Sequence, residues 1–348
     1  MATFAKSTFN ASIYSASRPT YPTQLFDYIF NHHRRKPNAG WKRAVDLGCG
    51  TGQATIQLHP FNEVIGLDPS ENMVKAAVAN SAFFPTSSTG ASLGGNHKFQ
   101  FRRGNAEDLS SAGIENESVD LVIAAQACHW FDWSKVWPEM ERILRVGGTA
   151  AFWIYSEFRL PEYLSVTPII TAYAQGGDPL TSLGPHFERP GRTILENHLL
   201  DVPSPDRVQQ TTRLSNEERV YFAGDYHTKT LPASQTLPVI MQKEMRWRDL
   251  LGYFRTWSSL YKYHELYPGD KVRAHDGRFL EDLETASTLT NEGAEEKDID
   301  VGGGDIAVRF WKDLRSAALE EKAGEARVGV NETLVVEWPL ALILVSKV

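Results

Sequence analysis

The sequence has few cysteines, no long apolar run and no excess of basic residues. Cys49 and Cys128 are its only two cysteines, which excludes a disulfide-rich scaffold and fits buried thiols in a reducing compartment. No segment approaches the ~20 apolar residues of a membrane-spanning helix. Residues 1–12 lack the basic and then apolar segments of a signal peptide. We therefore expect a cytoplasmic protein without a membrane partner.

The charge balance argues against nucleic acid as a partner. The formal net charge is -7, whereas a protein that grips a phosphate backbone usually presents a basic face. Hydrophobic residues make up 42% of the chain, which is enough for a sizeable core. The 348 residues suit one α/β domain with a large insertion better than two full domains. We expect a small-molecule partner, and the sequence leaves the oligomeric state open.

Apolar strands alternate with helical segments through the first half of the chain. Buried strands are predicted at 44–47, 64–67, 99–102, 119–125 and 149–154. Strands that alternate with helices form right-handed crossovers in a parallel sheet. The pattern therefore predicts an α/β fold with a doubly wound, mostly parallel sheet of the Rossmann-like type. After residue 155 the alternation stops, and an inserted cap is expected.

A glycine-rich loop follows the first predicted strand, where this architecture binds ligands. The loop contains Gly48, Gly50 and Gly52. A dinucleotide fingerprint G-x-G-x-x-G would need its third glycine at Gln53. Asp46 precedes the loop, and a carboxylate there disfavours a pyrophosphate but suits a ligand with an ammonium and a sulfonium group. The loop therefore favours S-adenosylmethionine over a nicotinamide dinucleotide.

Further candidates for binding this cofactor lie at the ends of the later strands. Asp68 ends the second strand, 20 residues after Gly48, and can accept hydrogen bonds from both ribose hydroxyls. Met73 can pack on the adenine face, and Asn105 or Glu107 can meet the adenine edge. A strand-end aspartate is often a helix cap and a methionine often a core residue, but their order and spacing favour the cofactor. The remaining candidates are Pro69, Ala106, Gln126 and Ala127.

Longer motifs make the pattern more specific. They are Tyr-x-x-x-Arg-Pro-x-Tyr-Pro at 14–22, Asp-Leu-Gly-Cys-Gly-Thr-Gly at 46–52, Cys-His-Trp-Phe-Asp at 128–132, Leu-Gly-Pro leading to Arg-Pro-Gly-Arg within 183–192, and Tyr-Phe-Arg-Thr-Trp-Ser at 253–258. Together they resemble the S-adenosylmethionine-dependent methyltransferases with a seven-stranded Rossmann-like sheet, and more closely the yeast and fungal trans-aconitate methyltransferase group. The resemblance implies transfer of a methyl group to a carboxylate of a small acid, with S-adenosylhomocysteine as the second product.

The resemblance and the element pattern divide the chain into four parts. These are an N-terminal arm and lid helix at 1–40, a cofactor-binding core at 41–155, an α-rich substrate cap with insertions at 156–236 and 246–325, and closing strands of the core sheet at 237–245 and 334–346. The stretches 83–96 and 267–306 look like insertions.

His129 follows the fourth predicted strand, at the edge where the transferable methyl group should point. A carboxylate acceptor is ionised at pH 7 and needs no general base, whereas a hydroxyl acceptor needs one. His129 is therefore a catalytic base, a hydrogen-bonding contact to the substrate, or a structural residue. Trp130 and Phe131 form an apolar wall of the substrate site or belong to the core.

Arginine and aromatic residues outside the core are candidates for closing the site. Arg18 can pair with the cofactor carboxylate while Tyr14 and Tyr21 close over it as a lid; the alternative is a surface arginine in a proline-rich arm. Arg192 and Arg255 can clamp a substrate carboxylate bidentately, or tie the cap to the sheet. Trp257, near Arg255, is a further candidate for substrate binding, and no metal ion is expected.

Three other functions remain open at this point. The acceptor can be a hydroxyl or phenol, as in fungal secondary metabolism, rather than a carboxylate. The chain can be a nicotinamide-dependent oxidoreductase, although the missing third glycine counts against it. It can also be a cofactor-binding protein of this fold that transfers no methyl group.

Overall fold

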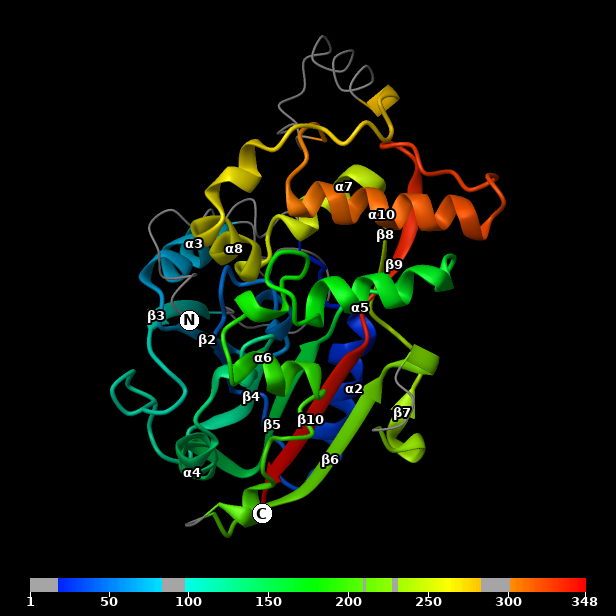
Figure 1. Ribbon diagram of the computed structural model, residues 1–348. Coiled ribbons are helices and arrows are strands. Elements are labelled where there is room, and N and C mark those ends of the chain that lie inside the picture. Colours follow the sequence, from blue (N-terminus) through cyan, green and yellow to red (C-terminus); the bar gives the residue numbers. More distant parts are fainter. Residues whose placement is uncertain (1–17, 83–97, 209–210, 227–230, 283–300) are drawn as a thin grey trace.

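The computed structural model describes residues 18–82, 98–208, 211–226, 231–282 and 301–348 (Figure 1). Its strands in the central sheet are β1 (Arg43–Leu47), β2 (Glu63–Asp68), β3 (Lys98–Arg103), β4 (Val119–Ala125), β5 (Leu144–Tyr155), β6 (Leu214–Phe222), β7 (Thr236–Leu237) and β10 (Leu340–Lys347). They lie in the order β3-β2-β1-β4-β5-β10-β6-β7, and β10 alone is antiparallel to its neighbours. The predicted Rossmann-like, mostly parallel sheet is confirmed, with the two-residue β7 as an added edge.

The predicted closing strand at 237–245 is wrong. The strand that pairs with β10 is β6, from the segment assigned to the cap. Residues 242–246 instead form β8 (Gln242–Arg246), which pairs with β9 (Thr333–Glu337) in a separate two-stranded sheet. The strand β6 carries polar residues and lies next to the edge of the central sheet, so it lacks the apolar run typical of a strand buried on both faces.

Helices cover both faces of the sheet. Helix α2 (Thr23–Arg34) buries Leu25, Phe26 and Ile29 in the same core cluster as Trp153 of β5. Helix α4 (Trp133–Ile143) buries its apolar face in the second core cluster. The glycine loop is followed by the short 3-10 helix η1 (Thr55–Leu58), and β2 by α3 (Glu71–Ser81). The two core clusters on opposite faces define a doubly wound domain.

The cap lies above one end of the sheet (Figure 1). Its helices are α5 (Thr167–Gln175), α6 (Gly191–Glu196), α7 (Trp247–Phe254), α8 (Ser258–Leu266) and α10 (Ile306–Glu321), with the β8–β9 pair beside them. The Trp311 Nε1 donates to the Trp247 carbonyl at 2.8 Å, which joins α10 to α7. Trp338, just before β10, donates from Nε1 to the Tyr253 hydroxyl at 3.1 Å and so connects the cap to the core.

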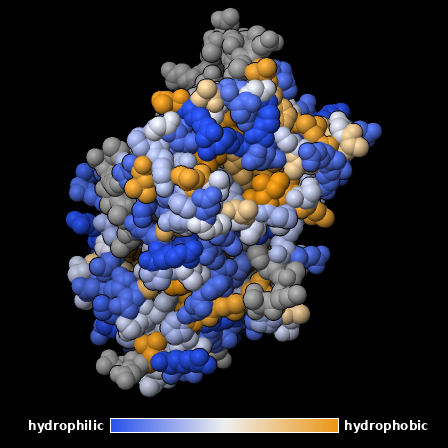
Figure 2. Space-filling view, in the orientation of Figure 1, coloured by the Kyte–Doolittle hydropathy of each residue, from blue (hydrophilic) through white to orange (hydrophobic). Residues whose placement is uncertain are grey.

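The surface seen in Figure 2 is mostly hydrophilic, and apolar residues are more frequent over the upper half, where the cap lies. Among the helices in the described part of the chain, none combines the length and apolar character needed to cross a bilayer.

Candidate active site

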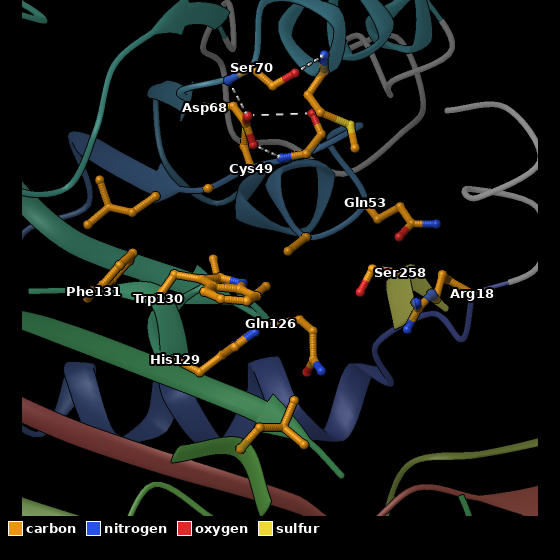
Figure 3. Close-up of a pocket in the computed structure, with 18 of the residues that line it drawn as sticks. Arg18, Cys49, Gln53, Asp68, Ser70, Gln126, His129, Trp130, Phe131 and Ser258 are labelled. Atoms are coloured by element: carbon orange, nitrogen blue, oxygen red, sulfur yellow. Dashed lines mark hydrogen bonds between the residues drawn. The ribbon is translucent and has the colours of Figure 1, made fainter. Parts of the chain in front are cut away.

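The strand order fixes where a ligand can enter. The order reverses direction between β1 and β4, so the loops after these two strands diverge and leave a crevice at the carboxyl edge of the sheet. A cavity of about 450 Å³ occupies this position, between the loops of the core and the cap. Figure 3 shows the core residues Asp68, Gln126 and His129 around it, with Arg18 and Ser258 on the opposite side.

The glycine loop adopts a conformation that requires glycine. Gly48, Gly50 and Gly52 have φ angles of +68°, +55° and +88°, a region that other residues rarely adopt. A Cβ atom on Gly48 would lie 2.5 Å from the Cβ of Ala127, whereas a Cβ on Gly50 would meet no atom within 4 Å. The loop therefore packs closely on the turn after β4 and leaves open space at Gly50, where a ligand can approach the backbone.

Asp68 joins the end of β2 to the glycine loop. Its Oδ2 accepts a hydrogen bond from the Gly50 N–H at 3.0 Å, and its Oδ1 accepts one from the Ser70 N–H at 2.8 Å (Figure 3). Burial raises the pKa of this carboxyl, although the two amide donors oppose the shift. Each carboxylate oxygen keeps capacity for a further hydrogen bond. Asp68 thus shapes the loop and can still accept the ribose hydroxyls of a nucleoside.

Asp46 lies below the glycine loop and does not line the cavity. Its side chain is fully buried, and its Oδ2 accepts a hydrogen bond from the Thr55 hydroxyl at 2.7 Å. Burial raises the pKa of Asp46 to about 7. The expected contact with a cofactor ammonium group is therefore corrected: this carboxyl supports the loop from within the core. Gly52 is also outside the cavity wall, because it turns the chain back toward Cys49, to whose carbonyl its N–H donates.

Most of the other predicted residues meet in the cavity wall. They are Arg18, Tyr21, Gly48, Gly50, Asp68, Pro69, Met73, Asn105, Ala106, Glu107, Gln126, Ala127, His129, Trp130, Phe131, Arg192 and Trp257. Arg255 does not line the cavity. Tyr14 lies outside the described residues.

Apolar and turn residues form the wall beyond β2 and β3. Met73 and Ala106 are each 5% exposed, so they offer a dry surface that suits an adenine ring. The Asn105 Oδ1 accepts a hydrogen bond from the Asp108 N–H at 2.9 Å, which closes a turn. Glu107 accepts one from the Asp132 N–H at 3.1 Å. These contacts hold the wall in place.

Gln126 holds the turn after β4 through its side chain. It has a φ of +55°, which non-glycine residues seldom adopt. Its carboxamide donates to the Tyr155 carbonyl at 3.1 Å and accepts from the Tyr155 N–H at 2.6 Å. The ends of β4 and β5 are therefore fixed to each other directly beneath the cavity.

His129 lies in the 3-10 helix η2 (Cys128–Trp130), just past β4. The residue is 7% exposed, and its Nδ1 is buried without a hydrogen-bond partner among the described residues. Burial, and then the positive charge of Arg192, lower the pKa of His129 to about 3. The imidazole is therefore neutral at physiological pH. It lies beside the Trp130 ring, with a centroid separation of 4.8 Å (Figure 3).

Arg192 of α6 is held by two acidic side chains. Its guanidinium donates to Glu157 and, at 2.8 Å, to Glu196, and it lies 3.9 Å from the centre of the Phe187 ring. Burial raises the pKa of Glu157, but the charges of Arg192 and Arg159 and the hydrogen bonds to this carboxylate together outweigh it and hold the pKa below its ordinary value. Glu157 is thus ionised, and the guanidinium fork that was expected to clamp a substrate carboxylate is already in use.

Arg255 connects two helices of the cap. Its Nη1 donates to the Asp305 carboxylate at 2.7 Å, at the start of α10, and the same carboxylate caps that helix by accepting from the Val308 N–H. The expected substrate clamp at Arg255 is therefore corrected, because the side chain is directed to α10. It ties α7 to α10, whereas the alternative considered from the sequence was a tie to the sheet.

Arg18 and Tyr21 bring the N-terminal segment to the cavity. Arg18 donates to the Tyr155 hydroxyl at 3.0 Å and to the Thr256 carbonyl at 3.1 Å, so it spans the core and the cap. The Tyr21 ring meets Trp153 edge-on, with centroids 5.4 Å apart. Arg18 and Tyr21 therefore form part of the wall.

Several wall residues were not predicted from the sequence. They are Thr51, Gln53, Tyr155, Ser156, Glu157, Phe187, Glu188, Leu195, Tyr253 and Ser258, among others. Tyr155, Ser156 and Glu157 follow β5, so the rule that points to strand ends could have identified them. The cap residues come from irregular segments, and no sequence period marks them.

Comparison with known proteins agrees with this geometry. Residues 45–152 match the family described as methyltransferase domain. The space above Gly50 and the acceptor capacity of Asp68 fit a nucleoside. Residues 45–152 therefore form a methyltransferase domain of Rossmann-like fold, and S-adenosylmethionine is its cofactor. The nicotinamide alternative is dropped.

The individual relatives carry methyltransferase assignments too. CRG1 of Saccharomyces cerevisiae, assigned as an S-adenosylmethionine-dependent methyltransferase, is 35% identical over 191 residues, which cover 55% of this chain and 60% of the yeast protein. A protein of Dictyostelium discoideum, also assigned as a methyltransferase, is 26% identical over 70% of this chain and 73% of its own length. A structure from Anaeromyxobacter dehalogenans, assigned as a type II methyltransferase, is 21% identical with a TM-score of 0.56, and covers 94% of this chain and 97% of that one. At this identity the last likeness shows the fold alone.

Proposed function

We propose that this chain is a small-molecule O-methyltransferase that acts on a hydroxyl oxygen. The observation that carries the proposal is His129, a buried imidazole in the cavity wall whose Nδ1 has no partner among the described residues. Its pKa of about 3, caused by burial and by Arg192, keeps it neutral. A neutral imidazole accepts one hydrogen bond, and a hydroxyl group can donate it.

The direction of this pKa shift favours one of two roles of His129. An efficient general base has a pKa near the working pH, whereas burial and the charge of Arg192 lower the pKa of His129 away from that range. We therefore assign it as the group that accepts the hydrogen bond of the acceptor hydroxyl and orients its oxygen, while the proton passes on to solvent. This is the substrate-contact role, and strong proton abstraction is not required of it.

The other residues hold the cofactor and exclude water. When bound, S-adenosylmethionine supplies a methyl group that its sulfonium already activates, and S-adenosylhomocysteine is left. Asp68 would accept hydrogen bonds from the ribose hydroxyls, and Met73 and Ala106 would cover the adenine. Trp130 and Phe131 form an apolar wall beside the acceptor. In a reaction of this kind the protein contributes mainly by positioning the reactants and excluding water.

A carboxylate acceptor is the second candidate. The motif resemblance to the trans-aconitate methyltransferase group favours it, as does the presence of Arg192 in the wall. Against it, Arg192 already contacts Glu157 and Glu196. The described wall also carries more acids than arginines: Asp68, Glu107, Glu157 and Glu188 against Arg18 and Arg192. A polycarboxylate would be repelled there, so the hydroxyl acceptor is preferred.

The test is a methylation assay with both classes of acceptor. The purified chain and S-adenosylmethionine are incubated separately with 2-naphthol, cyclohexanol, citrate and trans-aconitate, and products are sought by mass spectrometry as a gain of one methyl unit. Methylated product from a hydroxyl compound and none from the acids is expected. Product from the acids alone would replace this proposal with carboxylate methylation. No product from any compound, with S-adenosylhomocysteine still bound, would favour a binding protein.

Two variants of His129 refine the assay. His129→Gln keeps a hydrogen-bond acceptor at the site, whereas His129→Leu removes it. We expect the leucine variant to lower kcat for the hydroxyl acceptor roughly 10- to 100-fold, the range of a lost hydrogen bond, and the glutamine variant to retain more activity. Both should bind S-adenosylhomocysteine as the parent chain does. Equal kcat in all three proteins would remove His129 from the mechanism.

A further inference from the structure

Aromatic side chains from the core and from the cap line the cavity. They include Trp130 and Tyr155 from the core and Phe187, Tyr253 and Trp257 from the cap. Aromatic rings bury large apolar areas and favour offset or edge-on contact with other rings. A neutral aromatic molecule would find such partners on the core side and on the cap side of this space.

Trp257 is the centre of this aromatic wall. It is 6% exposed, and its ring centroid lies 5.9 Å from that of Tyr253 and 6.0 Å from that of Phe187. The Tyr253 ring stands at 88° to it and the Phe187 ring at 46°. Neighbouring rings fix the orientation of Trp257. Its exposed surface is therefore preorganised, and a ligand that binds to it would cause little further loss of side-chain entropy.

Ser156 is an unsatisfied polar group in the same wall. It follows β5 directly and is 3% exposed, and its backbone N–H donates to the Pro339 carbonyl at 2.9 Å. Its hydroxyl is buried and has no hydrogen-bond partner among the described residues. A buried hydroxyl without a partner costs free energy, and such a group in the wall of a cavity calls for an explanation.

We propose that the acceptor of this enzyme is a neutral phenol whose ring lies against Trp257 and which carries a second hydrogen-bonding substituent for the Ser156 hydroxyl. The inference rests on the proposed function, because His129 must meet the hydroxyl that is methylated. It adds the chemical class of the acceptor and a residue, Ser156, that sets specificity.

The chemistry of the site agrees with this class. A phenol ionises near pH 10, as tyrosine does, whereas water and similar hydroxyls ionise above 15. A phenolic oxygen therefore becomes nucleophilic without a strong base, which is the situation at His129. The engaged Arg192 and the ionised Glu157 further disfavour an anionic acceptor and leave a neutral one acceptable.

The first experiment measures binding rather than turnover. The full chain is saturated with S-adenosylhomocysteine and titrated by calorimetry with 2-naphthol, with its saturated analogue decahydro-2-naphthol, and with 2,3-dihydroxynaphthalene. We expect 2-naphthol to bind at least tenfold more tightly than the saturated analogue, and the diol more tightly than 2-naphthol. Trp257→Leu should reduce the preference for the aromatic ring, and Trp257→Phe should retain most of it. Equal affinity for the saturated and aromatic probes would overturn the proposal.

Variants of serine test the second contact. Ser156→Ala should abolish the advantage of the diol over 2-naphthol and leave the affinity for 2-naphthol within twofold. Ser234→Ala is the matched control, because Ser234 is exposed and does not line the cavity. A Ser156→Ala protein that keeps the full advantage of the diol, or that loses affinity for both probes equally, would overturn the role of Ser156.

A methyl-transfer assay with the same probes separates the two levels of the proposal. If decahydro-2-naphthol is methylated as readily as 2-naphthol, the proposed function stands and the phenol class is wrong. If the aromatic probes bind with the expected preferences but receive no methyl group, the ligand class stands and the proposed function is wrong. Preferential methylation of the phenols supports both.

Discussion

Replacing Asp68 by alanine should weaken cofactor binding without unfolding the domain. In the structure this carboxylate already accepts the Gly50 and Ser70 amides, and it keeps acceptor capacity for the ribose. A hydrogen bond to a charged group contributes about 1.5–3 kcal/mol. Since every 1.4 kcal/mol is a factor of ten, we expect the Kd for S-adenosylhomocysteine to rise roughly 10- to 150-fold. The Asp68→Asn variant keeps one acceptor oxygen, so its Kd should lie between that of the parent chain and that of Asp68→Ala.

Isothermal titration calorimetry with S-adenosylhomocysteine measures this directly. Glu71→Ala is the matched control. This substitution also removes one negative charge near the start of α3, but Glu71 is exposed and lies outside the cavity wall. Its Kd should stay within twofold of the parent value. An unchanged Kd for Asp68→Ala, or an equal rise for both variants, would refute the ribose role.

Three further predictions concern stability and loop geometry. Arg255→Ala should lower the free energy of unfolding by about 1–2 kcal/mol, because the pair with Asp305 is partly buried; KM for acidic and neutral acceptors should change equally, and a selective rise for the acids would restore the clamp role. Gly48→Ala should lower the melting temperature and abolish S-adenosylhomocysteine binding, because the new Cβ meets Ala127 at 2.5 Å and φ is positive; if Ala127→Gly does not restore part of the stability, this contact is not the cause. Burial raises the pKa of Asp46 from 3.8 to about 7, so the native state binds this proton more tightly than the unfolded chain does. The free energy of unfolding should therefore fall as pH rises from ~4 to ~7. Asp46→Asn should flatten this pH dependence in denaturant titrations, and an unchanged slope would contradict the pKa shift.

The core of the fold could be predicted because its strands are marked in the sequence by short apolar runs. The strand β4 is an apolar run buried along almost its whole length, and it alternates with helices of clear period. The strand β6 could not be predicted in the same way. Its Arg219 donates to the Leu199 and Val202 carbonyls, so its polar residues are satisfied by contacts distant in sequence. Local pattern carries no information on such contacts.

The candidate site likewise contains residues that local sequence features predict and residues whose contacts depend on tertiary packing. The position of Asp68 and Gly48 in the cavity wall could be predicted because it depends on strand ends and backbone conformation, both of which are local. Asp46 and Arg255 were assigned to ligands because a charged residue near a motif suggests one. The structure gives both a protein partner instead, Thr55 for the first and Asp305 for the second. Whether a charge faces a cavity or another side chain depends on tertiary packing.

We propose that the crevice between the glycine loop and the end of β2 holds the nucleoside of S-adenosylmethionine. A crystal structure of the chain grown with S-adenosylhomocysteine tests this most directly. We expect the ribose hydroxyls to donate hydrogen bonds to the Asp68 carboxylate and the adenine to lie between Met73 and Ala106. A nucleoside bound at another place, or one whose ribose makes no contact with Asp68, would contradict it.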